Sequence, residues 1–245
     1  MGQYNTPTKH ALITGASRGI GAAIARCFAQ DGYALTLTCS QSMEALSALC
    51  ADLQNRFQVP CTPIQADVSR EADVARLFAG LTDLDVLVNN AGISYVGLLT
   101  DMTLDDWRRI LGVNLDSCFL TARAAIPLML RRQRGRIINI SSVWGNVGAS
   151  TEVAYSASKG GMNAFTQALA KELAPSGIQV NAIACGVIDT SMNACFSEDE
   201  REALRAEIPA DRFGRAEEVG QLALQLAQAP DYLTGQILTL DGGWT

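Results

Sequence analysis

Tyr155 and Lys159 are the residues of this sequence best placed to do chemistry together, because they lie four positions apart in a helical pattern. Residues four apart share one face of an α-helix, so the phenol and the ammonium group are expected to reach one site. A phenol with a pKa of about 10 exchanges protons poorly at neutral pH, and a nearby ammonium lowers that pKa. The pair predicts proton transfer by Tyr155, although such pairs are also common on exposed helix faces.

Ser142 supplies a third polar group. It follows the apolar run 136–140, which predicts a strand, so its hydroxyl is expected at the carboxyl end of that strand. A hydroxyl there can polarise a carbonyl oxygen. Ser142, Tyr155 and Lys159 together therefore predict chemistry on a carbonyl group.

A glycine-rich segment after the first predicted strand indicates a nucleotide site. Backbone N–H groups in such a turn approach a pyrophosphate closely, and the start of the following helix favours its negative charge. The spacing is G-x-x-x-G-x-G, which meets the general dinucleotide pattern only approximately. The predicted cofactor-binding residues of this turn are Gly15, Ser17, Arg18, Gly19, Ile20 and Gly21.

The end of the second predicted strand bears on which nicotinamide cofactor binds. NAD enzymes usually have an acidic residue there to bind the ribose 2′-hydroxyl, whereas this chain reads Cys39-Ser40-Gln41-Ser42. Arg18 and the hydroxyl groups of Ser40 and Ser42 suit a 2′-phosphate. The sequence favours NADP(H) over NAD(H), although Arg18 is also explained as a solvated loop cation.

Seven short apolar runs alternate with longer helical patterns, which predicts one α/β domain over residues 1–245. We expect a Rossmann-type, doubly wound parallel sheet of seven strands flanked by helices, with ligands at the carboxyl ends of the strands. Pro127 should kink or break the longest helix. Strands are predicted at 10–14, 34–39, 62–65, 85–89, 136–140, 179–184 and 236–240. Helices are predicted at 20–30, 42–56, 71–79, 103–132, 155–174 and 216–228.

The composition argues against several classes of protein. There are 19 basic and 25 acidic residues, a balance that opposes nucleic-acid binding. The densest basic run, 131–136, is either a solvated helix end or a docking patch. Without a long apolar run or leader, no membrane partner is expected. The seven cysteines include no C-x-x-C pair, which indicates reduced thiols in a cytoplasmic protein and no metal site. They are Cys27, Cys39, Cys50, Cys61, Cys118, Cys185 and Cys195.

These motifs together resemble the classical short-chain dehydrogenase/reductase family over nearly the whole chain. The matching features are TGASRGIG at 14–21, NNAG at 89–92, Asn114, Ser142, and Tyr155 with Lys159, in the family's order. The resemblance implies that Asn114 holds a water in a proton relay and that Lys159 binds the nicotinamide ribose while tuning Tyr155. It further implies cofactor contacts from Asp67, Val68, Asn89, Ala91, Gly92, Ile188 and Thr190.

One position departs from the family pattern. The family usually has Pro-Gly after the sixth strand, where this chain has Cys185-Gly186, so the loop there is freer to move. Cys185 is not expected to be a nucleophile, because no histidine accompanies it. His10, the chain's one histidine, precedes the first strand, which argues against Ser-His-Asp hydrolysis.

The resemblance implies NADPH-dependent reduction of a ketone by a homotetramer. The general likeness is to 3-oxoacyl-[acyl-carrier-protein] reductases, with a small-molecule or carrier-protein-bound ketone as substrate. A second likeness, through 91–103 and 141–161, is to reductases of an aminopentanone group on elongation factor P. A non-catalytic nucleotide sensor or scaffold on the same fold is the alternative from another class.

Glu152 bears on the substrate, because it lies in the loop between Ser142 and Tyr155. A carboxylate beside the reacting carbonyl would attract an ammonium group and repel an anionic one. A negative charge at a helix start is also favourable in itself. Basic residues in 131–136 would instead suit a carrier protein. The sequence therefore leaves both substrate classes open.

Overall fold

The computed structural model describes residues 9–191 and 197–245, and it contains one parallel sheet of seven strands. Their spatial order is β3-β2-β1-β4-β5-β6-β7, and every neighbouring pair is parallel. The expected doubly wound α/β architecture is confirmed. The strands are β1 (His10–Ile13), β2 (Ala34–Cys39), β3 (Cys61–Gln65), β4 (Val86–Asn89), β5 (Gly135–Ser142), β6 (Ile178–Cys185) and β7 (Ile237–Leu240).

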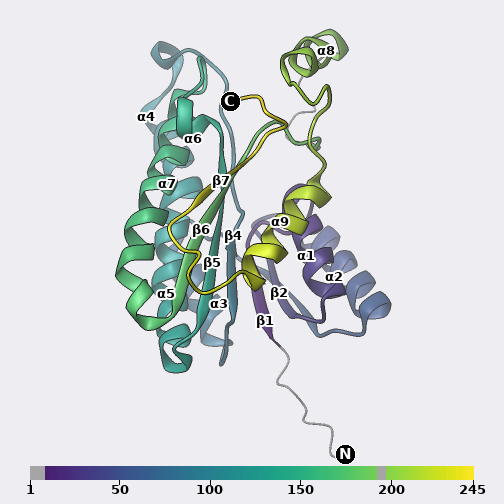
Figure 1. The fold of residues 1–245 in the computed structure, drawn as a ribbon, viewed down its shortest axis with the longest axis vertical. Helices are drawn as coiled ribbons and strands as arrows, with labels where there is room; N and C mark the ends of the chain where they lie inside the picture. The colour runs from purple at the N-terminus through teal and green to yellow at the C-terminus, as the bar shows by residue number, and fades with distance from the viewer. Residues whose placement is uncertain (1–8, 192–196) are drawn as a thin grey trace, which may run out of the picture.

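Helices cover both faces of the sheet (Figure 1). Side chains alternate between the faces along β1, so Ala11 and Ile13 pack into one core while Leu12 packs into the other. Helices α1 (Gly19–Gln30), α2 (Met43–Phe57) and α9 (Ala216–Gln228) cover the first face. The opposite face is covered by α3 (Glu71–Ala79), α5 (Ser117–Arg132) and α7 (Val153–Leu173). Burial on both faces explains why the strands read as continuous apolar runs.

The predicted helix over 103–132 is divided in a way that the sequence did not indicate. The chain forms α4 (Leu104–Leu111), a π-helical turn over Gly112–Asp116, and then α5. Pro127 lies inside α5, which runs on to Arg132, so the expected break near Pro127 is wrong. The departure from α-helical bonding is instead at Asn114, whose side chain bonds to a neighbouring loop.

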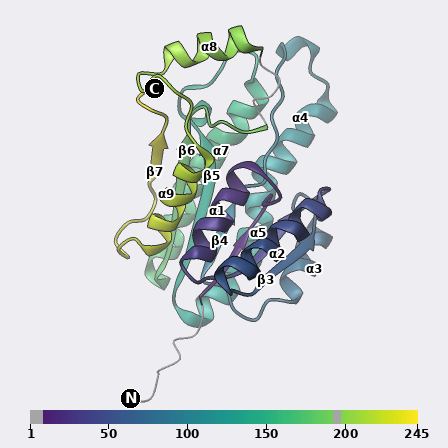
Figure 2. The ribbon, with the colours of Figure 1, turned by 90° about the vertical axis from the view of Figure 1, so that its right-hand side faces the viewer.

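Two further helices were not predicted: α6 (Trp144–Val147) and α8 (Glu198–Glu207). Helix α8 lies beyond the carboxyl ends of the strands (Figure 2). Its sequence is too polar to show an apolar face, but Ser197 and Glu200 form a capping box at its start. The S-x-x-E pattern was therefore the signal that could have identified it.

The segment Leu104–Arg132 is long and apolar enough to cross a membrane by length and composition alone. Here Ala122, Ala125 and Met129 are buried in the core against the sheet. The most apolar window of this segment is 39% buried, so packing against the sheet accounts for part of its apolar character.

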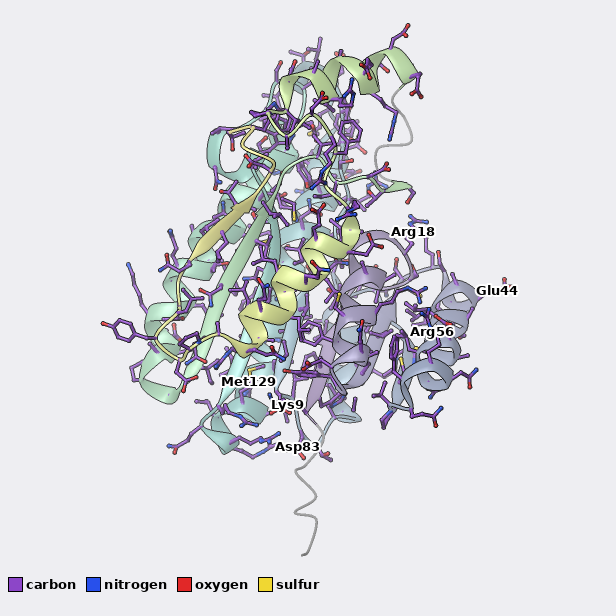
Figure 3. The ribbon with its side chains drawn as sticks, turned by 45° about the vertical axis from the view of Figure 1, so that its right-hand side comes forward. Lys9, Arg18, Glu44, Arg56, Asp83 and Met129 are labelled. Atoms are coloured by element: carbon purple, nitrogen blue, oxygen red, sulfur yellow. The ribbon has the colours of Figure 1, made fainter. Side chains whose placement is uncertain are left out.

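The basic run 131–136 lies at the amino end of the sheet. Arg132 and Arg134 pair with the buried Asp85 at 3.3 and 2.8 Å, and Arg136 pairs with Asp231 at 2.6 Å. Figure 3 shows Asp83, which also pairs with Arg132, near the start of β1. Arg18 lies well away from it. The run therefore does not supply basic groups at the carboxyl ends of the strands, because Arg132, Arg134 and Arg136 pair with acidic residues at the opposite end and Arg131 bonds to the Thr82 carbonyl oxygen there.

Candidate active site

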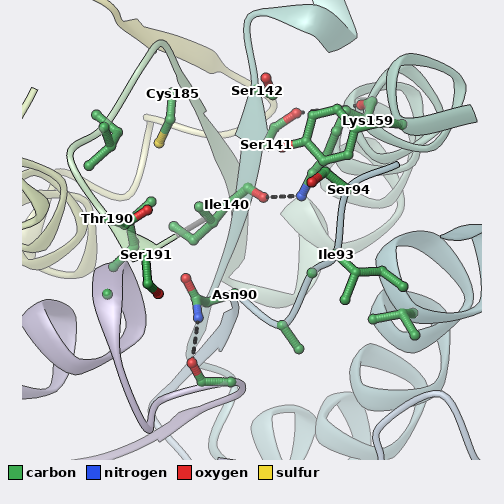
Figure 4. Close-up of a pocket in the computed structure, with 18 of the residues that line it drawn as sticks. Asn90, Ile93, Ser94, Ile140, Ser141, Ser142, Lys159, Cys185, Thr190 and Ser191 are labelled. Atoms are coloured by element: carbon green, nitrogen blue, oxygen red, sulfur yellow. Dashed lines mark hydrogen bonds between the residues drawn. The ribbon is translucent and has the colours of Figure 1, made fainter. Parts of the chain in front are cut away.

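A cavity of about 1190 Å³ lies at the carboxyl ends of the strands, where a doubly wound sheet binds its ligands. The strand order reverses between β1 and β4, and the glycine turn after β1 faces the loop after β4 at this point. Figure 4 shows Asn90 of the loop after β4 with Ser142 at the end of β5 and Cys185 at the end of β6. The topology thus brings the predicted motifs to one cavity.

The glycine turn is held in place by the loop after β4. Asn90 donates its side-chain N–H to the carbonyl oxygens of Thr14 and Gly15, at 2.9 and 3.0 Å. Gly21 lies behind this turn, where a Cβ would be 2.5 Å from both Asn90 Nδ2 and the Gly15 oxygen. Gly15 and Gly19 have positive φ angles of 64° and 56°. The turn therefore needs glycine for backbone conformation and for close packing.

The dinucleotide end of the cavity fits an anionic ligand. Helix α1 has no side-chain cap at Arg18, and Gly19 and Ile20 line the cavity, so the positive end of the helix faces it. The exposed Arg18 side chain stands at the same end, and Ser40 and Ser42 line the wall after β2. Asp67 and Val68 line it after β3.

Lys159 is 3% exposed and donates a 2.8 Å hydrogen bond to the carbonyl oxygen of Ile140 (Figure 4). An ammonium group has three donors, and Lys159 also lines the cavity. Burial lowers the pKa of Lys159. A buried ammonium directed at this cavity suits the hydroxyl groups of a nicotinamide ribose, so the residues present fit the cofactor.

Tyr155 and Ser142 meet beside Lys159. The Ser142 side chain lies close enough to the Tyr155 phenol to lower its pKa, and Lys159 Nζ lies 5.7 Å from the centre of the Tyr155 ring. Burial raises the pKa of Tyr155 well above its usual range, and the Ser142 contact opposes that shift. The lowering of the Tyr155 pKa by the Lys159 ammonium that the sequence predicts is not found. In the chain alone Tyr155 is therefore a neutral phenol at pH 7, able to give a proton.

Asn114 is fully buried on the π-helical turn, and its side chain is occupied by protein partners. It accepts a hydrogen bond from the N–H of Ile93 at 2.9 Å and donates to the Ile93 oxygen at 2.9 Å and to Ser158 Oγ at 3.0 Å. Asn114 thus joins the loop after β4 to α7. A water molecule in a proton relay could bind only to the backbone carbonyl oxygen of Asn114. That oxygen already accepts a hydrogen bond from Cys118 Sγ.

We predict that Asn114→Ala destabilises the protein by about 1–3 kcal/mol, because the part-buried Ile93 backbone groups lose their partner. Urea unfolding followed by circular dichroism measures this change. Asn55→Ala, at an exposed position of α2, is the control and should change stability by less than about 0.5 kcal/mol. Equal stability of wild type and Asn114→Ala would show that this connection does not support the fold.

Three predicted site residues do not line the cavity: Gly21, Asn89 and Asn114. Asn89 is 3% exposed, donates to Asn139 Oδ1 at 2.9 Å and accepts from Thr121 Oγ1 at 2.7 Å. These bonds direct its side chain into the core between β4, β5 and α5. The Asn89 side chain therefore does not reach the cavity, and the cofactor-binding and catalytic roles expected of Asn89, Gly21 and Asn114 stay predictions.

The loop after β6 lines the remaining side of the cavity with Cys185, Ile188 and Thr190. Burial raises the pKa of the Cys185 thiol to about 12, which keeps it protonated and unreactive at neutral pH. Gly186 approaches the end of β7 so closely that a Cβ would lie 2.8 Å from the Asp241 Cα. Cys195 lies outside the described residues, and the other six cysteines are free thiols.

The outer part of the cavity contains residues that the motifs did not indicate. Trp144 of α6 and Trp244 near the carboxyl terminus pack with ring centres 4.8 Å apart. The cavity is also lined by Arg108 and Arg109 of α4 and by Glu200 and Glu207 of α8. His10 lies at the other end of the sheet, bonded to Asp83 and Thr36.

A glycine-rich turn on a doubly wound sheet, beside a buried Ser-Tyr-Lys group, defines a nicotinamide-dependent oxidoreductase. The chain belongs to the short chain dehydrogenase family, whose model matches residues 9–201.

Its relatives match over almost their whole lengths. An oxidoreductase of Bacillus subtilis, called uncharacterized oxidoreductase YmfI, is 40% identical over 96% of this chain and 98% of its own. The 3-oxoacyl-[acyl-carrier-protein] reductase of Synechocystis is 41% identical over 95% of each chain. The crystal structure of a putative gluconate dehydrogenase from Agrobacterium tumefaciens superimposes with a TM-score of 0.92, at 34% identity, over 96% of this chain and 95% of that one.

Proposed function

We propose that the protein is an NADPH-dependent reductase that converts a ketone to a secondary alcohol, as 3-oxoacyl thioester reductases do. The observation that carries the proposal is the convergence of Ser142, Tyr155 and Lys159 on the cavity that also contains the glycine turn. The whole chain is proposed to act as one NADP-binding domain.

The proposed mechanism assigns one task to each side chain. The bound nicotinamide would supply a hydride to the carbonyl carbon. Tyr155, a neutral phenol, donates its proton to the carbonyl oxygen as negative charge develops there. Ser142 donates a hydrogen bond to the same oxygen. Lys159, held by Ile140, binds the ribose hydroxyls and keeps positive charge beside Tyr155.

The test is an assay of NADPH oxidation at 340 nm with acetoacetyl thioesters, amino-ketones, sugars and steroids. We expect turnover with at least one ketone and formation of the matching secondary alcohol. Absence of turnover across the panel, with NADPH bound, would favour the non-catalytic nucleotide sensor or scaffold instead.

Preference for NADPH rests on charge at the dinucleotide end, and Arg18→Ala tests it. We expect the variant to lose at least about tenfold more affinity for NADPH than for NADH, because a 2′-phosphate distinguishes the two. Fluorescence titration with each cofactor gives both dissociation constants. Arg56→Ala, at an exposed position of α2 outside the cavity, is the matched control. Equal losses for both cofactors in Arg18→Ala would reject this role.

Two substrate classes follow from the site. The names of relatives such as the Synechocystis enzyme favour an acyl thioester on a carrier protein, and Arg108 and Arg109 at the cavity give basic groups for an anionic substrate. The second candidate is the aminopentanone group on elongation factor P. Glu152, a half-buried carboxylate in the same cavity, favours it.

A cytoplasmic homotetramer is proposed as the working form. Leu104 of α4, Phe119 of α5 and Val153 of α7 are large apolar side chains that are 60%, 47% and 41% exposed, which suits burial between subunits. Small-angle X-ray scattering gives the mass in solution. A mass near 26.1 kDa, that of one chain, would reject the tetramer.

A further inference from the structure

Glu152 stands at the start of α7 but does not cap the helix. It occupies the N-cap position without a side-chain cap hydrogen bond, so the usual reason for an acidic residue there does not apply. Its side chain instead lines the cavity, where the nearby Trp144 side chain lowers the pKa of the carboxyl group. Burial raises its pKa above the usual value, which shows that part of its hydration has been removed. A desolvated carboxylate gains from a cationic partner.

Trp144 and Trp244 form the aromatic part of the same wall. Their ring centres are 4.8 Å apart with the planes inclined by 60°, and both side chains are half-buried. The faces of indole rings attract cations within about 6 Å of the ring centre, and the attraction grows when water is excluded. Aromatic faces beside a carboxylate are the usual surroundings of an ammonium ligand.

This wall is next to the reacting group. Glu152 precedes Tyr155 by three residues, and its charge raises the pKa of the Tyr155 phenol. A positive group bound at Glu152 would therefore lie in the same cavity as a carbonyl that accepts the Tyr155 proton. The same cation would offset the unfavourable effect of Glu152 on Tyr155, so binding would also assist proton transfer.

The charges across the cavity favour the same ligand. Glu200 and Glu207 of α8 add carboxylates to the outer wall. Arg108 and Arg109 of α4 oppose them, and all four side chains are exposed, so water and salt screen their charges more than that of the half-buried Glu152, which has the strongest effect on a ligand.

We propose that Glu152, Trp144 and Trp244 form a subsite for an ammonium group, so that the preferred ketone carries a positive charge a few bonds from its carbonyl. The inference rests on the proposed ketone reduction. It assigns the substrate class from this chain's own side chains and makes Glu152 a residue that determines specificity.

Three ketones of matched length test the subsite. The cation is 5-(trimethylammonio)pentan-2-one, which cannot cyclise; 6,6-dimethylheptan-2-one is its uncharged isostere, and 5-oxohexanoate carries a carboxylate. We expect wild-type kcat/KM to be at least about tenfold higher for the cation than for the isostere, and lowest for the anion. Glu152→Gln should reduce the ratio of cation to isostere by about tenfold or more.

Three further variants separate the charge pairing from a general loss of structure. Trp244→Leu should lower the same ratio several-fold, whereas Trp244→Phe should retain most of it. Glu172→Gln, at an exposed position near the other end of α7, should leave all three ketones unaffected. Unchanged ratios in Glu152→Gln, or a wild-type preference for the isostere or the anion, would overturn the proposal while leaving ketone reduction intact.

Binding provides an answer that does not depend on turnover. Calorimetric titration of the cationic ketone and its isostere, with NADP⁺ present, should show tighter binding of the cation by wild type than by Glu152→Gln. If no ketone is reduced, the proposed function fails and this titration still decides the subsite. Equal affinities in the two proteins would reject it.

Discussion

Tyr155→Phe is expected to lower turnover by at least about a hundredfold while NADPH still binds, because only the transferable proton is removed. The phenol hydroxyl contacts Ser142, and the ring itself packs beside Lys159, so the variant keeps the shape of the site. Steady-state rates with a saturating ketone measure the loss in kcat. Fluorescence titration measures the dissociation constant of NADPH, which should change by less than about threefold.

The control for this variant is Tyr232→Phe. Tyr232 is 100% exposed in the turn before β7, far from the cavity, so the same chemical change there should have no effect on rate. A near-normal rate in Tyr155→Phe would mean that another group, or water, supplies the proton. The assignment of Tyr155 as the acid would then be wrong.

The fold could be predicted because each strand is covered on both faces. Val86, Leu87 and Val88 of β4 are all at most 2% exposed, so the strand reads as an unbroken apolar run. A parallel sheet in turn places the carboxyl ends of its strands together, which made the location of the site predictable from the glycine turn and Ser142.

The remaining features depend on contacts between distant segments. Asn89 and Asn90 are neighbours in the sequence, yet one side chain bonds in the core and the other holds the glycine turn. The side chains of adjacent strand residues point to opposite faces, and no local pattern shows which face a polar group will occupy. Likewise, Trp244 meets Trp144 only because β7 lies beside β6.

Lys159 is expected to be essential for turnover and to contribute little to stability at pH 7, a combination that Lys159→Met can separate. The side chain is 3% exposed, and burial lowers its pKa because the charged form loses hydration. The variant should lose at least about a hundredfold in kcat/KM, since it removes both the proposed ribose contact and the positive charge beside Tyr155. Methionine removes the buried charge but leaves the Ile140 oxygen without its donor. These effects oppose each other, so we expect the free energy of unfolding at pH 7 to change by less than about 2 kcal/mol.

The pH dependence distinguishes burial of a charge from loss of packing. Between the lowered pKa of folded Lys159 and the ordinary value of about 10.4, the unfolded chain binds a proton that the folded chain does not, so wild-type stability rises with pH. Methionine cannot titrate, and its variant lacks this rise. Urea unfolding of both proteins at several pH values up to about 10 should therefore show the free energy of unfolding of wild type increasing with pH relative to that of Lys159→Met. Lys171→Met, at an exposed position of α7, is the control and should follow wild type. Parallel curves for wild type and Lys159→Met would mean that folding does not lower the pKa of Lys159, and the predicted cost of burying its charge would be wrong.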